Sequence, residues 1–203
     1  MTMAADIYRS ARLVYRSVQP EDETIFCQIQ SDPIALRNSN PRLEKPPTRK
    51  DAQDLMRAVE EALLGVVICL PSPPGSSPPQ RPIAIGDIHL SPLEPDLAHH
   101  RFTTIHINIM SEYQGQGYGS EAINWALDWA FSTAGIHRVG VQVLGFNTGA
   151  KRLYERLGFK QEGVTRDMFW QAGRWWDDIQ FGMLDAEWKK LREGQESRKQ
   201  VKW

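Results

Sequence analysis

The chain has 203 residues, a formal net charge of −1 at pH 7 and a hydrophobic content of 41%. This length fits one domain with a single sizeable core, and the near-zero charge provides no basic field that would attract nucleic acid. No apolar stretch approaches the roughly 18 uninterrupted residues that a membrane-spanning helix requires. We therefore expect a globular protein that binds neither nucleic acid nor a membrane.

The N-terminal segment and the cysteines favour a cytoplasmic location. Residues 1–12 carry three charged side chains and have no apolar centre, so we expect no secretory signal. The two cysteines, Cys27 and Cys69, both lie in apolar surroundings. Such cysteines are typical of buried, reduced thiols rather than of a disulfide framework.

In the first half of the chain, short apolar runs alternate with amphipathic segments. The patterns predict strands at 13–16, 65–70, 83–90 and 102–110, and helices at 20–30 and 49–64, the second capped by Thr48. Residues 31–48 hold four prolines, which predicts an irregular, mobile loop. Residues 71–82 read PSPPGSSPPQRP, and we expect them to form the long tip of a hairpin rather than a domain boundary.

The second half continues the same alternation. It predicts a helix at 120–134 ended by Gly135, a strand at 137–144, a helix from the Asn147 cap to Gly158, and strands at 160–170 and 175–184 joined by a turn at Ala172-Gly173. The charged segment from Glu187 is expected to fray. We thus expect one α/β domain over residues 1–188, with a charged tail over 189–203.

A glycine-rich segment, Gln114-Gly115-Gln116-Gly117-Tyr118-Gly119, lies between a predicted strand and a predicted helix. Backbone N–H groups at the positive end of a helix dipole bind phosphate or pyrophosphate. The Lys-Ser/Thr pair of a Walker-type loop is missing after the last glycine, which disfavours an NTPase. A dinucleotide-binding fold would place such a loop after its first strand and would carry an acidic residue further on. In this chain the loop follows the later predicted strand at 102–110, which disfavours that fold. A nucleotide-binding module and a purely structural turn remain alternatives.

This loop resembles the Gln/Arg-x-x-Gly-x-Gly/Ala signature of the GNAT acyl-CoA N-acyltransferases, and Ser111-Glu112-Tyr113 fits the usual approach to it. Residues 147–159, NTGAKRLYERLGF, are similar to the family's Asn…Ala…Tyr-x-x-Leu-Gly-Phe block. Residues 162–178 resemble the ribosomal-protein-alanine and spermidine acetyltransferase branch. The resemblance covers residues 13–188. It implies an α/β (α+β) fold whose central sheet is mixed and mostly antiparallel, with helices on both faces and one splayed strand pair.

The resemblance also implies an N-acetyltransferase that uses acetyl-CoA, needs no metal and acts as a monomer or homodimer. The acceptor would be a primary amine: a small amine, a polyamine or a protein N-terminus. The loop N–H groups would hold the pyrophosphate, and the preceding strand would pair with the pantetheine arm and polarise the thioester carbonyl. The cofactor-binding residues would be Ile107, Asn108, Ile109, Gln114, Gly115, Gln116, Gly117, Tyr118, Gly119 and Asn147.

The resemblance indicates a catalytic acid but leaves the base open. By resemblance, Tyr154 would protonate the leaving thiolate, although its helical spacing alone favours a core aromatic. Many relatives carry a glutamate base where this chain has Thr103 and Thr104. The remaining candidates are His89, His106, Glu112, Asp177, Asp178 and a water molecule. A catalytically weak CoA-binding sensor or scaffold is therefore the alternative function. His99-His100 has no regular third ligand, so we expect a loop pair rather than a metal site.

No cysteine lies in these motifs. An acyl-enzyme intermediate is therefore disfavoured, and direct attack by the amine is the predicted mechanism.

Overall fold

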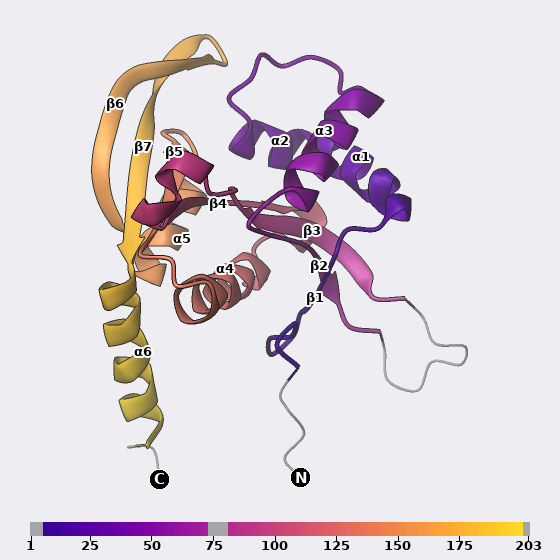
Figure 1. The fold of residues 1–203 in the computed structure, drawn as a ribbon. Coiled ribbons are helices and arrows are strands. Elements are labelled where there is room, and N and C mark those ends of the chain that lie inside the picture. Colours follow the sequence, from indigo (N-terminus) through magenta and orange to yellow (C-terminus); the bar gives the residue numbers. More distant parts are fainter. Residues whose placement is uncertain (1–5, 73–80, 201–203) are drawn as a thin grey trace. The chain divides into compact units, whose positions relative to one another are not determined.

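The computed structural model describes residues 6–72 and 81–200. The chain forms two compact units, Met1–Pro92 with His106–Trp125, and Leu93–Ile105 with Ala126–Trp203. One boundary lies between Pro92 and Leu93, and the other two fall within β4 (Phe102–Ile109) and α4 (Tyr118–Asp128). The strand order is β1-β2-β3-β4-β5-β7-β6 (Figure 1).

The first unit contains three antiparallel strands, β1 (Val14–Arg16), β2 (Leu64–Leu70) and β3 (Ile83–Leu90). In β2 and β3, Leu70 lies opposite Ile83, so the two strands form the predicted hairpin. Most of its expected tip, residues 73–80, lies outside the described residues. Besides most of α4, this unit holds α1 (Glu23–Ser31), preceded by a 3-10 turn at Pro20–Asp22, α2 (Pro33–Ser39) and α3 (Arg49–Glu60).

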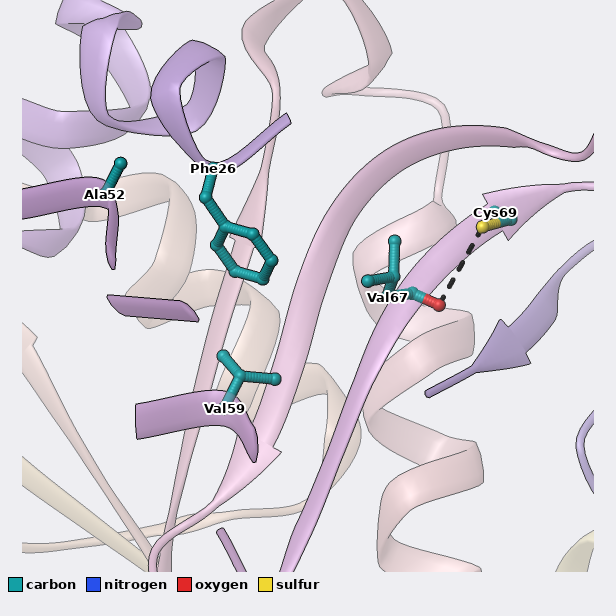
Figure 2. Packing of buried hydrophobic residues seen from close by; sticks show 5 residues of the cluster. All are labelled: Phe26, Ala52, Val59, Val67 and Cys69. Atoms are coloured by element: carbon teal, nitrogen blue, oxygen red, sulfur yellow. Dashed lines mark hydrogen bonds between the residues drawn. The ribbon is translucent and has the colours of Figure 1, made fainter. Parts of the chain in front are cut away.

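Helices cover both faces of these strands. Val67 and Cys69 of β2 pack with Phe26 of α1 and with Ala52 and Val59 of α3 in a buried cluster (Figure 2). Side chains alternate between the faces of a strand, so the neighbouring Ile68 and its partner Tyr15 point to the opposite face.

On that opposite face, the Tyr15 ring stacks on Trp125 of α4 with ring centroids 3.8 Å apart. The α1 side of the same strands also carries an ion pair. Arg16 donates to both carboxylate oxygens of the buried Asp22, at 2.6 and 2.7 Å.

The second unit pairs β7 (Arg174–Leu184) antiparallel with β5 (Arg138–Leu144) and with β6 (Lys160–Gln171). The start of β4 runs parallel to β5, where Phe102 lies opposite Arg138. The unit's helices are a π-helical segment at Trp129–Thr133, α5 (Thr148–Leu157) and α6 (Asp185–Gln200). The mixed, mostly antiparallel sheet confirms the predicted fold class, whereas the expected splay between β4 and β5 stays a prediction.

Two sequence-based expectations are wrong. The irregular loop predicted for 31–48 contains the helix α2. Pro33 occupies its first helical position, where a proline is tolerated. The Asp32 carboxylate accepts from the N–H groups of Ile34 and Ala35, both at 3.0 Å. The segment predicted to fray from Glu187 is helical through Gln200.

α6 is anchored by its first turns. Trp188 is buried, its indole N–H donates to Asp128, and Arg192 pairs with the same carboxylate. The predicted helix at 49–64 is also shorter, since α3 ends at Glu60 and β2 begins at Leu64. The division into one domain over 1–188 and a tail over 189–203 stays a prediction.

Candidate functional site

The glycine-rich loop joins β4 to α4 in the first unit. A 3-10 turn at Ser111–Tyr113 follows β4, and α4 begins at Tyr118, two residues earlier than the sequence predicted. Gly115 and Gly117 have φ angles of 72° and 85°, a left-handed conformation that side chains other than glycine disfavour. These two glycines therefore set the path of the loop into the helix.

The backbone N–H groups of this loop are largely uncommitted. The N–H of Gln114 donates to Ser111 O at 3.2 Å. Its side chain donates to Ile109 O at 2.7 Å. For the N–H groups of 115–119, no hydrogen-bond acceptor is found among the described residues. A row of unpaired donors at the start of a helix is a fitting site for a phosphate group.

Arg12, which precedes β1, braces this loop. Its guanidinium donates to Gln116 O at 3.0 Å and lies 4.7 Å from the centre of the Tyr118 ring. It also pairs with Glu121 in the first turn of α4, with Nε 2.8 Å from Oε2. Although burial raises the pKa of Glu121, hydrogen bonds from Ser10 and Arg12 outweigh it and hold that pKa below its usual value. Glu121 is therefore an ionised anchor at neutral pH.

A cluster of polar side chains links β3 to β4, the strand that leads into the glycine-rich loop. Asp87 is fully buried and accepts from Asn108 Nδ2 at 2.9 Å. Its other oxygen lies 3.3 Å from Nδ1 of His89. The His89 ring stacks on His106 with centroids 4.7 Å apart and planes inclined by 13°. Nε2 of His106 lies 3.1 Å from Ser91 Oγ.

The cluster lies on the face of the sheet that α1 and α3 cover, because Asp87 stands opposite Val67 of the buried cluster. Gly86 lets β4 come close, since a Cβ at that position would lie 2.0 Å from Asn108 O. Loss of hydration, with a smaller effect of the His89 charge, lowers the pKa of His106 to about 4. His106 is thus neutral at physiological pH.

In the second unit, α5 carries both downstream candidates. Asn147 caps the helix, its Oδ1 accepting from Ala150 N at 3.0 Å, and Gly158 ends it with a φ of 92°. Tyr154 is 5% exposed and packs against Phe159 and Phe181. Burial raises the pKa of the Tyr154 phenol, so the phenol is protonated at neutral pH. Its hydroxyl has no hydrogen-bond partner among the described residues.

Asp178 of β7 is a buried carboxylate with one unmatched oxygen. Oδ2 accepts from Gln180 Nε2 at 2.6 Å and from Gln142 Nε2 at 3.3 Å. Oδ1 has no partner among the described residues. An unmatched buried acceptor costs stability unless a donor reaches it.

The remaining candidates are placed as follows. Thr103 is buried and Thr104 half-buried, and a threonine hydroxyl does not titrate near neutral pH, so neither provides an acid or a base. Glu112 is exposed and lies in the turn before the loop. His99 and His100 lie side by side in a 3-10 turn. Within residues 6–72 and 81–200, no three His, Cys, Asp or Glu side chains gather as a metal site.

The Gln114 side chain ties the loop to the strand before it, and their role as a cofactor site stays a prediction. Arg12, Glu121 and Asp87, which contact these elements, were not among the predicted site residues. The available signal for Asp87 was a polar alternation in two adjacent apolar strands: Asp87 and His89 in one, His106 and Asn108 in the next. Arg12 and Glu121 are over 100 positions apart, and no local pattern links them.

None of the helices in the described part of the chain has the length and apolar character needed to cross a membrane. Comparison with known proteins gives a consistent result. Residues 12–160 match the acetyltransferase (GNAT) domain family. The chain is 27% identical over 192 residues to the SPbeta prophage-derived uncharacterized N-acetyltransferase YokL of Bacillus subtilis, covering 92% of this chain and 98% of that protein.

A shorter match is to spermidine N(1)-acetyltransferase of Vibrio cholerae, 34% identical over 89 residues, which are 44% of this chain and 51% of that enzyme. Among solved structures, the spermidine N-acetyltransferase of Vibrio cholerae in complex with CoA and spermine superimposes with a TM-score of 0.71. The sequence identity is 21%, over 88% of this chain and 99% of that one. This likeness concerns the fold. Because the family match spans most of the chain, the protein belongs to the GNAT acetyltransferase family and is an acetyl-CoA-dependent N-acyltransferase.

Proposed function

We propose that the protein acetylates a primary amine by direct attack of the neutral amine on acetyl-CoA, with no acyl-enzyme intermediate. The acceptor is a small amine, a polyamine or a protein N-terminus. The observation that carries this proposal is the row of N–H groups over 115–119 at the start of α4, for which the described part of the chain supplies no acceptor. When bound, acetyl-CoA supplies the activated acetyl group.

The cofactor contacts follow from the loop and the strand before it. The N–H groups from Gly115 to Gly119 receive the pyrophosphate, while Gln114 and Gln116 set the loop through their bonds to Ile109 and Glu112. The backbone of Ile107, Asn108 and Ile109 pairs with the pantetheine arm as an added strand would. Asn147, beyond its capping role, contacts the pantetheine amides.

Tyr154 protonates the leaving thiolate in this proposal. A phenol with a raised pKa holds its proton at neutral pH, and its hydroxyl is not already engaged by a described residue. A hydrogen bond from the Tyr154 hydroxyl to the forming CoA thiolate stabilises this leaving group before the proton is transferred.

The acceptor class draws support from the comparisons. Two relatives have names that fit this class: spermidine N(1)-acetyltransferase, and the [ribosomal protein uS5]-alanine N-acetyltransferase of Escherichia coli, which is 30% identical over 81 residues. The latter match covers 40% of this chain and 42% of that enzyme.

The test is release of free CoA thiol from acetyl-CoA in the presence of an amine panel that includes polyamines, amino acids and N-terminal peptides. We expect turnover with at least one cationic amine. CoA binding without turnover on any member of the panel would instead support a sensor or scaffold.

A further inference from the structure

We propose that His106 is the base that accepts the proton released by the acceptor nitrogen, and that Asp87 and His89 are positioning residues that hold it. The inference rests on the proposed amine acetylation and names a group for a step that Thr103 and Thr104 cannot perform. The three side chains come from β3 and β4 and touch one another in sequence: Asp87 to His89 by a 3.3 Å polar contact, and His89 to His106 by ring stacking.

The position of His106 suits this role. Its surface is partly exposed although its imidazole has lost hydration, whereas Asp87 and His89 are buried. It precedes Ile107, the first residue of the backbone stretch proposed to pair with the pantetheine arm. On an extended strand, His106 and Asn108 point to one face and the flanking isoleucines to the other. The ring therefore lies on the α1 and α3 side of the strand.

The protonation state is also suitable. Ser91 Oγ can accept from Nε2–H of His106, which leaves the lone pair on Nδ1. Asp87 favours the tautomer of His89 that carries its proton on Nδ1. The charges that act on His106 are those of His89, which lowers its pKa, and Asp87, which raises it. The ring is neutral before reaction, and the Asp87 carboxylate stabilises the imidazolium that forms.

The atoms balance as follows. The neutral amine forms the N–C bond, and its nitrogen becomes positively charged and strongly acidic. His106 takes one proton from that nitrogen, the C–S bond breaks, and the thiolate takes the Tyr154 proton. His106 then releases its proton to solvent and Tyr154 regains one, so the products are an amide and CoA thiol. Because the adduct is more acidic than a free ammonium ion, it loses its proton to a weaker base than the free amine would require.

The test uses His106→Ala and His106→Gln in the full chain, with His100→Gln as the matched control. We expect kcat to fall by about 10²-fold in both His106 variants, the usual contribution of a general base, with unchanged CoA binding. The control should keep its kcat, because His100 lies in a 3-10 turn of the other unit. The unfolding midpoint of each variant shows whether it is folded.

Chemical rescue separates a base from a packing residue. Added imidazole should restore part of the kcat of His106→Ala, and the restored rate should rise with the basicity of substituted imidazoles. It should not restore Tyr154→Phe. An unchanged kcat in the folded His106 variants would overturn the assignment of the base. So would a rescued rate that does not depend on the basicity of the added imidazole. No turnover by the wild-type protein on any amine would instead refute the proposed function.

Discussion

Arg12 and Glu121 are joined twice: the backbone N–H of Arg12 donates to Oε1 at 2.6 Å, and its Nε donates to Oε2 at 2.8 Å. The same guanidinium reaches Gln116 O in the glycine-rich loop. A residue that precedes the first strand therefore bridges the loop and the first turn of the helix that follows it. This places the conformation of the loop under the control of the N-terminal segment.

Replacing Arg12 with alanine should raise the KM for acetyl-CoA roughly tenfold with little change in kcat. The Arg12 side chain is 48% exposed, so we expect about 1.4 kcal/mol, which is less than a buried charged hydrogen bond would contribute. Steady-state kinetics with varied acetyl-CoA measures the effect. Arg9→Ala is the control, since Arg9 pairs only with the exposed Asp6 in the described part of the chain. An unchanged KM in Arg12→Ala would show that the loop does not need this brace.

Gly117→Ala should weaken CoA binding more than it weakens the fold. The position has a φ of 85°, which disfavours any side chain, and a Cβ would lie 3.3 Å from Nη2 of Arg12, so the bracing guanidinium or the loop must give way slightly. The backbone cost is about 1 kcal/mol. Gly173→Ala is a matched control, because its φ is 79° and a Cβ there meets nothing within 4 Å.

Both glycine variants should lose similar stability in thermal unfolding. CoA titration by calorimetry should weaken in Gly117→Ala alone. Equal affinities in the two variants would argue against a pyrophosphate site in this loop.

Tyr154→Phe should lower kcat by about 10²-fold if the phenol is the acid, with little loss of stability because its hydroxyl has no partner among the described residues. Thiol release at saturating acetyl-CoA and amine gives the readout. Tyr8→Phe, which changes an exposed side chain, should match the wild type. An unchanged kcat in Tyr154→Phe would show that this tyrosine is a core aromatic and not the acid.

Acid should destabilise the fold through Asp22. Burial raises its pKa, but hydrogen bonds from Arg16 and from Gln19 N outweigh this, so the folded-state pKa lies below the unfolded value. The stabilisation is therefore fully present above the unfolded pKa of about 3.9 and is lost as the pH falls through the folded-state pKa.

Chemical unfolding of the wild type and Asp22→Asn at pH 7 and pH 3 tests this pair. At pH 7 the variant should be less stable by about 3 kcal/mol, because it leaves Arg16 without its buried partner. The difference should shrink at pH 3. A constant difference across this range would mean that Asp22 stabilises the protein through shape rather than charge.

Local sequence patterns were sufficient to predict most helices and strands, because caps and turns depend on only a few neighbouring residues. The cap of α3 is one case, where Thr48 and Asp51 bond reciprocally as a capping box. The turn between β6 and β7 is another: Ala172 and Gly173 both have positive φ values, as a tight hairpin turn requires. The missed helix α2 shows the limit of composition. Four prolines suggested a loop, but Pro33 lies where its missing N–H costs nothing and Asp32 satisfies the next donors.

The amino-acid sequence alone determined the order of most elements and the glycine-rich turn, because periodicity, caps and left-handed glycines act over a few neighbouring residues. The tertiary structure decided which distant side chains meet there. Strand pairing and packing across long stretches of chain bring Arg12 to Glu121, and the close approach of β3 and β4 at Gly86 brings Asp87 and His89 to His106 and Asn108. Such contacts depend on register and packing, which no local pattern encodes.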